Sequence, residues 1–102
     1  MNISRTRREG HSTVIRIPPQ FDFKQHVEFR RTVDHILGDG RASEIVIDFV
    51  GTHSVDSAGL GMLLNLRDAA RGAGRNVVLT NASGAVRQML ETAQFKNIFE
   101  IR

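Results

Sequence analysis

Two kinds of apolar spacing alternate along this chain, and the alternation predicts a layered α/β fold. Apolar and β-branched residues form short runs at 12–17, 45–49 and 76–80, and apolar and polar residues alternate at 98–101. Runs of this kind are typical of strands. The segments between them carry apolar residues at three- and four-residue spacing, which is typical of amphipathic helices. The resulting order implies mostly parallel central strands joined by right-handed crossovers.

Three helices are predicted, and their ends have local signals. The predicted bounds are 22–37, 57–73, and a third helix that follows the turn at 81–84 and closes at 96–97. Asp22 and Gln25 have the spacing of a capping box, in which the aspartate serves as the helix N-cap. Glycines at the ends of the first two helices are typical stop signals.

The strand at 45–49 and the helix that follows it form the most informative stretch of the chain. The strand is almost continuously apolar, as expected of a central strand covered on both faces. Ser57 then lies at the mouth of a helix, where a phosphate would meet free N–H groups and the positive end of the helix dipole. The plainer alternative is that Ser57 or Asp56 is simply the N-cap.

Length and composition limit the class of protein. The chain has 102 residues, 40% of them hydrophobic, which suits one domain with a modest core. Cysteine is absent, so disulfides, cysteine zinc sites and thiol catalysis are excluded. The longest apolar runs are too short to span a membrane, and the N-terminus does not have the pattern of a secretory signal. We expect a cytoplasmic protein, with residues 1–10 a polar arm or edge strand and 11–102 the domain.

The net charge of +3 raises the question of nucleic-acid binding. The arginines are interleaved with acids, as in the pair Arg87 and Glu91, which has the four-residue spacing of a helix ion pair. Tyrosine and tryptophan are absent, so bases could stack only on phenylalanine. The pattern favours a mixed-charge, solvated surface, and the histidines show no metal-ligand spacing.

Two enzymatic interpretations of the segment around Ser57 do not fit its residues. Gly59 and Gly61 suggest a dinucleotide loop, but position 64 is Leu64 and no phosphate-loop lysine follows. Those glycines instead favour close packing of the helix on the sheet. A hydrolase nucleophile elbow requires glycine two residues before the serine, where this chain has Val55. We therefore expect a protein that is not an enzyme.

The segment that opens the second predicted helix resembles the phosphorylation motif of STAS domains, the sulphate-transporter and anti-sigma-factor-antagonist family. It reads Val55-Asp56-Ser57-Ala58-Gly59-Leu60-Gly61. The resemblance runs from about Thr13 to Ile101, and includes the leucine-rich helix and the closing segment 95–99. It implies a STAS-like fold, with a single layer of about four to five mixed strands, mostly parallel in the centre, and about three helices packed on it.

The resemblance also assigns roles to individual residues. In this family the serine directly after the aspartate is phosphorylated, which implies that Ser57 is the phosphate acceptor. Asp56, rather than Ser57, is then the expected N-cap of the second predicted helix. The next position often carries a second hydroxyl, but here it is Ala58, so the acceptor is unique. Asp22 corresponds to a family aspartate near the partner interface, although its neighbours differ from the common form. The implied partner-binding residues are Asp22, Asp56, Ser57, Ala58, Gly59 and Leu60.

The function that the resemblance implies is that of a bacterial anti-sigma factor antagonist, a signalling phosphoprotein that regulates transcription by partner switching. The unphosphorylated form would bind an anti-sigma factor that is itself a GHKL-type serine kinase. Phosphorylation of Ser57 would end the binding, and a PPM-type serine phosphatase would restore it. No cofactor, metal, nucleic acid or membrane insertion is implied, and the protein would be a monomer or weak dimer.

A second function remains open at this point. STAS domains also occur as subunits of membrane transport assemblies, where the domain docks on a transporter ATPase or permease. A kinase and a phosphatase encoded near this chain would favour the first function, and transporter genes would favour the second.

Overall fold

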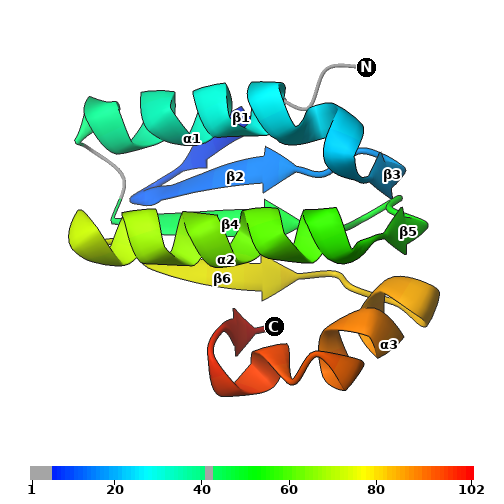
Figure 1. Cartoon of the computed structure of the whole chain (residues 1–102). Helices are drawn as coiled ribbons and strands as arrows, with labels where there is room; N and C mark the ends of the chain where they lie inside the picture. Colours follow the sequence, from blue (N-terminus) through cyan, green and yellow to red (C-terminus); the bar gives the residue numbers. More distant parts are fainter. Residues whose placement is uncertain (1–5, 41–42) are drawn as a thin grey trace.

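The computed structural model describes residues 6–40 and 43–102, which form one mixed sheet with helices packed against it (Figure 1). The strands of the main sheet are β1 (Thr6–Glu9), β2 (Ser12–Arg16), β4 (Glu44–Asp48), β6 (Asn76–Thr80) and β7 (Glu100–Ile101). They lie in the order β1-β2-β4-β6-β7; β1 is antiparallel to β2, and all other pairs are parallel. The predicted α/β fold with a mostly parallel sheet is confirmed. Residues 1–5 of the predicted arm lie outside the described part of the chain.

The helices follow the predicted order, with shifted ends. They are α1 (His26–Asp39), preceded by the 3₁₀ turn η1 (Phe23–Gln25), then α2 (Ser57–Gly72) and α3 (Gly84–Thr92). The capping box of Asp22 and Gln25 is confirmed, but it caps η1. The third helix was expected to reach 96–97, yet Gln94 adopts a left-handed conformation with φ 58° and the chain continues as a separate 3₁₀ turn, η2 (Phe95–Asn97). The last strand is accordingly shorter than predicted.

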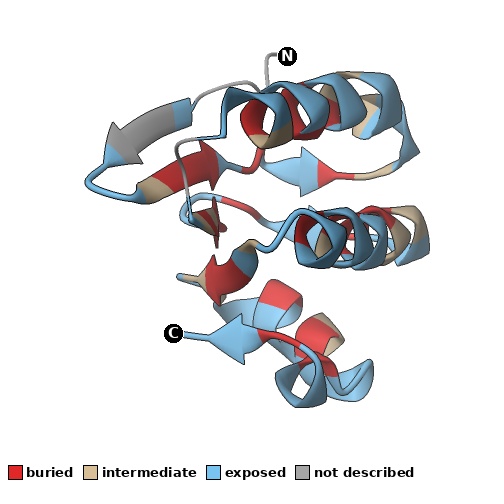
Figure 2. Ribbon diagram, turned by 90° about the vertical axis from the view of Figure 1, so that its left-hand side faces the viewer, coloured by how far each residue is buried: buried red, intermediate tan, exposed pale blue. Residues whose placement is uncertain are grey.

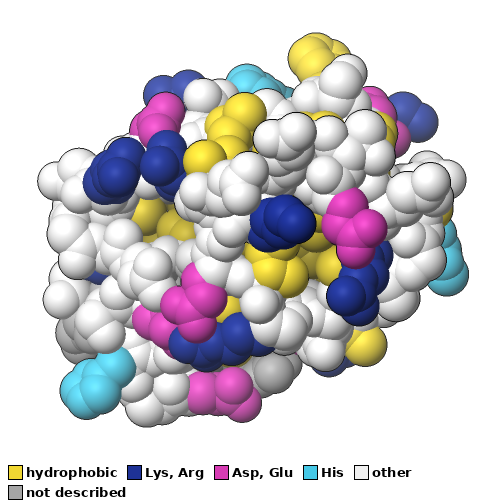
Figure 3. Space-filling model, turned by 90° about the horizontal axis from the view of Figure 1, so that it is seen from below, with side chains coloured by type: hydrophobic (Ala, Val, Ile, Leu, Met, Phe, Trp, Pro, Cys, Tyr) yellow, Lys and Arg dark blue, Asp and Glu magenta, His cyan; other side chains and the backbone are white. Residues whose placement is uncertain are grey.

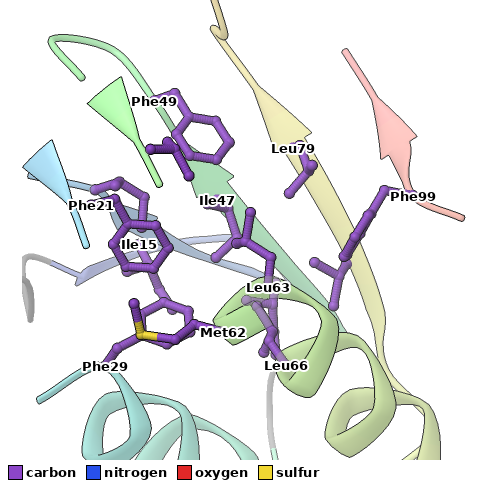
Figure 4. Packing of buried hydrophobic residues seen from close by; sticks show 14 of the residues in the cluster. Ile15, Phe21, Phe29, Ile47, Phe49, Met62, Leu63, Leu66, Leu79 and Phe99 are labelled. Atoms are coloured by element: carbon purple, nitrogen blue, oxygen red, sulfur yellow. The ribbon is translucent and has the colours of Figure 1, made fainter. Parts of the chain in front are cut away.

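The main core lies between the sheet and the helices. In-register residues of the three central parallel strands point toward the helices, among them Ile15, Ile47 and Leu79. Figure 4 shows them packed against side chains that include Phe29 of α1 and Leu63 of α2. Burying each such side chain stabilises the fold by about 1.5–3 kcal/mol relative to leaving it exposed. This layer fixes the position of α2, and therefore of the segment around Ser57.

The other face of the sheet differs from expectation. The helices lie to one side of the sheet (Figure 2), so the strand at 45–49 is not covered by helices on both faces. Val46, in the centre of this face, is half-buried, and its in-register neighbours Val14 and Val78 are buried. Charged side chains lie along this face: Arg102 donates to Glu44 at 3.3 Å, and Arg16 lies 4.0 Å from Asp48. The apolar run therefore predicted correctly that β4 lies in the centre of the sheet. The prediction that both faces of the strand are covered was wrong as far as helices are concerned.

Arg75 joins the two long helices. Its guanidinium donates to the carbonyl oxygens of Ile36 and Leu37, at 3.1 and 3.0 Å, in the last turn of α1. The carbonyls of a last helical turn have no partner within their own helix, and the negative end of the dipole favours a cation there. Arg75 thus caps α1 from the loop that follows α2.

We expect Arg75→Met to lower the free energy of unfolding by about 1–3 kcal/mol, because two charge-assisted hydrogen bonds to partly buried carbonyls are lost. Arg75→Lys should be intermediate, since an ammonium is a compact charge without the planar fork. The matched control is Arg71→Met, which removes an exposed arginine from the last turn of α2 and should change stability by less than about 0.5 kcal/mol. Urea denaturation measures all three; equal loss in the two Met variants would contradict the proposed cap.

Candidate functional site

A second, very small sheet brings the two aspartates of the predicted site together. The strands β3 (Gln20–Phe21) and β5 (Ser54–Val55) pair in parallel, with Phe21 opposite Val55. The pairing continues one residue further, where the Asp56 N–H donates to the Phe21 carbonyl at 3.3 Å. Asp22 and Asp56 therefore leave adjacent chain ends, at the end of the molecule where α1 and α2 begin (Figure 1).

Asp56 supplies the N-cap of α2. Its carboxylate Oδ1 accepts a hydrogen bond from the Gly59 N–H at 2.8 Å, and its carbonyl accepts from the Leu60 N–H at 3.0 Å. The prediction that Asp56 rather than Ser57 is the cap is confirmed. Ser57 is the first residue of the helix, and its side chain is exposed. The serine hydroxyl is thus free of any capping role, at a position where helix N–H groups have no intrahelical acceptor.

Gly59 allows α2 to lie against β3. A Cβ atom at this position would lie 2.5 Å from the Phe21 carbonyl oxygen and 2.8 Å from Val55 Cγ1. Real Cβ atoms do not approach other atoms this closely, so only glycine fits. The sequence-based expectation of close packing is confirmed for Gly59. It is wrong for Gly61, where a Cβ would meet nothing within 4 Å.

Asp22 is held by its own capping box. Its Oδ1 accepts from the Lys24 N–H at 2.9 Å, and its N–H donates to the Gln25 side chain at 2.7 Å. The side chain is half-buried. The local role of a cap is therefore present, and any role toward a partner would be additional to it.

The predicted partner-binding residues lie together but differ in how much surface they offer. Asp56 and Ser57 are exposed, Asp22, Ala58 and Leu60 are half-buried, and Gly59 is buried. Leu60 packs on the edge of the hydrophobic core. The polar groups at this end are thus one exposed hydroxyl at a helix N-terminus and two carboxylates, each of which accepts a backbone N–H of its own cap.

Sequence reasoning missed two apolar residues next to this site. Phe23 is 74% exposed and Val27 is 62% exposed, the two highest values among the large hydrophobic residues described. The signal was present, because both positions fall off the apolar stripe of the predicted first helix, which Phe29, Val33 and Ile36 define. An apolar residue off the buried stripe is expected to be exposed.

The surface elsewhere carries both signs of charge. On the face around α3 and β7, basic and acidic side chains are intermingled with apolar ones (Figure 3). The predicted ion pair of Arg87 and Glu91 is confirmed at 3.1 Å. Across residues 6–40 and 43–102, no group of three or more His, Asp or Glu side chains is placed to hold a metal ion. Within the same ranges, no helix combines the length and the apolar character needed to cross a membrane.

An exposed serine thus begins a helix that the preceding aspartate caps, beside the short strand that leads to Asp22, and the comparisons with known proteins identify the family. The chain belongs to the STAS domain family, because the family model described as "Mlab, STAS domain" matches residues 4–100. Among curated proteins, a STAS-domain containing protein of Pseudomonas aeruginosa is 36% identical over 93 residues, which cover 91% of this chain and 90% of the relative.

Solved structures share the fold at low sequence identity. The structure of TM1081 from Thermotoga maritima superposes with a TM-score of 0.84 at 17% identity, covering 96% of this chain and 78% of TM1081. The anti-sigma factor antagonist SpoIIAA in its unphosphorylated form superposes with a TM-score of 0.76 at 19% identity, covering 96% of this chain and 86% of SpoIIAA. The phosphorylated form of SpoIIAA from Bacillus gives a TM-score of 0.73 at 17% identity, with coverages of 96% and 89%. The protein is thus a STAS domain that resembles anti-sigma factor antagonists in structure.

Proposed function

We propose that this STAS domain is a phosphorylation-controlled antagonist of an anti-sigma factor, with Ser57 as the phosphate acceptor. The observation that carries the proposal is that capping and the exposed hydroxyl belong to two different residues at the start of α2. Asp56 caps the helix through Gly59, so the exposed Ser57 hydroxyl next to it takes no part in holding the helix. A group can therefore be added to Ser57 without removing a bond that the fold needs.

The same geometry tolerates the added charge. A phosphoserine carries about −1.5 to −2 charge at pH 7. At the first residue of a 16-residue helix, that charge meets the positive end of the dipole, which stabilises exposed anions by about 0.3–1 kcal/mol. The neighbouring carboxylates of Asp22 and Asp56 oppose it. Neither effect removes a hydrogen bond that holds the helix, so phosphorylation would change the surface and leave the fold intact.

The proposed partners are those that the resemblance to anti-sigma factor antagonists implies. The unphosphorylated form would bind a GHKL-type serine kinase that acts as an anti-sigma factor, and a PPM-type phosphatase would remove the phosphate. SpoIIAA supports this proposal, because it has the same fold and has been solved in both unphosphorylated and phosphorylated forms. The protein itself would act as a cytoplasmic binding module and not as an enzyme.

Incubation with the cognate kinase and ATP tests the acceptor directly. We expect one phosphate per chain for the wild type, none for Ser57→Ala, and full labelling for the control Ser54→Ala, which removes another exposed hydroxyl three residues earlier. Ser57→Ala should fold normally, since exposed substitutions change stability by less than about 0.5 kcal/mol. Labelling that survives in Ser57→Ala would disprove the assignment. Absence of labelling, together with binding to a transporter ATPase, would favour the second function that the family allows.

A further inference from the structure

We propose that Phe23 and Val27 form the apolar anchor by which this domain docks on the partner protein that acts at Ser57. The inference rests on the proposed function and adds to it a surface outside the predicted site. The inference starts from the exposure of both side chains. A phenylalanine that is 74% exposed buries little apolar surface and therefore adds little to the stability of the fold. Large exposed apolar side chains that are grouped together mark interaction surfaces.

The Phe23 side chain is positioned by contacts within this chain. The backbone of Phe23 lies within the capping box formed by Asp22 and Gln25, and its ring stacks on His26, with centroids 6.3 Å apart and planes 12° from parallel. A side chain that is ordered before binding loses less conformational entropy when a partner covers it. Rigid aromatic anchors near the centre of a patch carry a large share of binding energy in many interfaces.

The anchor lies next to the site around Ser57 and next to a groove between α1 and α2. Phe23 is two residues beyond Phe21, whose carbonyl binds the Asp56 N–H, so it lies at the same end of the molecule as Ser57 (Figure 1). His26, on which the ring stacks, also lines a groove of about 310 Å³ between α1 and α2, together with Arg30, Met62 and Asn65. A partner that covers Ser57 could therefore reach Phe23 and place a side chain in the groove.

The charges around the anchor favour a protein over a lipid surface. Lys24, Arg30 and Arg31 are exposed on η1 and α1, where they outnumber the acids Glu28 and Asp34, whereas Asp22 and Asp56 lie at the adjacent ends of β3 and β5. An anionic bilayer would be attracted by the first group and repelled by the second. A protein can match both, with acidic groups facing Lys24 and Arg30 and a basic group facing the aspartates. We infer an apolar pocket rimmed in this way on the kinase.

Binding of the purified cognate kinase, in the presence of a nonhydrolysable ATP analogue, tests the anchor by calorimetry. We expect Phe23→Ser to weaken affinity by about 30-fold or more, and Val27→Ser by about fivefold, because anchors of this kind are hot spots. Lys24→Glu should slow association and weaken its salt dependence. The matched control is Ile101→Ser, which removes a 40% exposed apolar side chain from β7, away from the start of α2; we expect no more than about a twofold change. Matching circular dichroism spectra and melting temperatures establish that the variants are folded.

The outcomes separate this inference from the proposed function. If Ser57→Asp loses binding but Phe23→Ser binds like the wild type, the anchor is wrong and the phosphorylation switch stands. If the kinase binds no form of the protein, both are wrong. Co-sedimentation with phosphatidylcholine vesicles, with and without phosphatidylserine, tests the membrane alternative. A Phe23→Ser variant that loses vesicle binding but keeps kinase binding would overturn the protein anchor.

Discussion

Ser57→Asp is expected to weaken binding to the proposed kinase by about 30- to 1,000-fold, or about 2–4 kcal/mol, whereas Ser57→Ala should bind within about threefold of the wild type. The reason is that Ser57 is exposed at the centre of the proposed contact, directly after Asp56, which already places negative charge there. The added charge must be desolvated when the partner docks, and the helix N-terminus offsets only part of that cost.

Calorimetry at low and high salt distinguishes contact from long-range repulsion. The control Ser54→Asp places the same charge on β5, three residues away and also exposed. A long-range Coulomb effect would appear in both variants and fade above about 0.5 M salt, since screening lengths then fall below about 5 Å. An effect that is confined to Ser57→Asp and persists in salt would indicate a desolvated contact. Equal affinities of the wild type and Ser57→Asp would refute the electrostatic switch.

Gly59→Ala is expected to lower the free energy of unfolding by about 1–3 kcal/mol, even though alanine is the better helix former. The added methyl group would lie 2.5 Å from the Phe21 carbonyl oxygen, a backbone atom that cannot rotate away. Either α2 shifts outward from β3 or the two short strands separate. Both movements disturb the hydrogen bond from Asp56 to Phe21, and therefore the cap of α2.

Gly61→Ala is the matched control, because Gly61 lies two residues further along the same helix and a methyl group added there would meet open space. In this variant only the helix propensity should matter, so we expect the free energy of unfolding to rise by up to about 1 kcal/mol. For a domain of this size, each kcal/mol corresponds to a shift in melting temperature of about 4–8 °C. The two alanines should therefore move the melting temperature in opposite directions. If they behave alike, close packing does not explain Gly59.

The packing of Gly59 against β3 also determines the geometry of the site around Ser57. Gly59 allows the start of α2 to approach β3, and that approach places Asp56 next to the chain end that carries Asp22. The prediction for Gly59→Ala consequently extends beyond stability. If the cap shifts, kinase affinity should fall as well, although no surface charge has changed.

Several features of the fold could be predicted because their causes are local. The order of strands and helices followed from apolar spacing, and the caps at Asp22 and Asp56 followed from side chains that bond to backbone a few residues away. The end of the third helix was missed, because no glycine or proline marks it and the chain turns at Gln94.

The site itself is decided partly by contacts that leave no local trace. The strands β3 and β5 are two residues long, which is too short for any periodic pattern, and they pair across a whole strand and helix of intervening sequence. The family pattern implied that Ser57 and Asp22 both belong to the partner-binding site. Only the pairing of Phe21 with Val55 shows how they come to one end of the molecule.

The sequence by itself determined the α/β order, the capping box of Asp22 and Gln25 and the serine that begins the second helix, because each depends on residue type and spacing within one segment. The tertiary structure alone decided which glycine is indispensable, which face of the sheet remains without helices, and that Phe23 and Val27 are exposed beside the site. These features depend on distances between segments that are far apart in the chain. No sequence pattern indicates, for example, that a Cβ atom at position 59 would lie 2.5 Å from a backbone carbonyl oxygen.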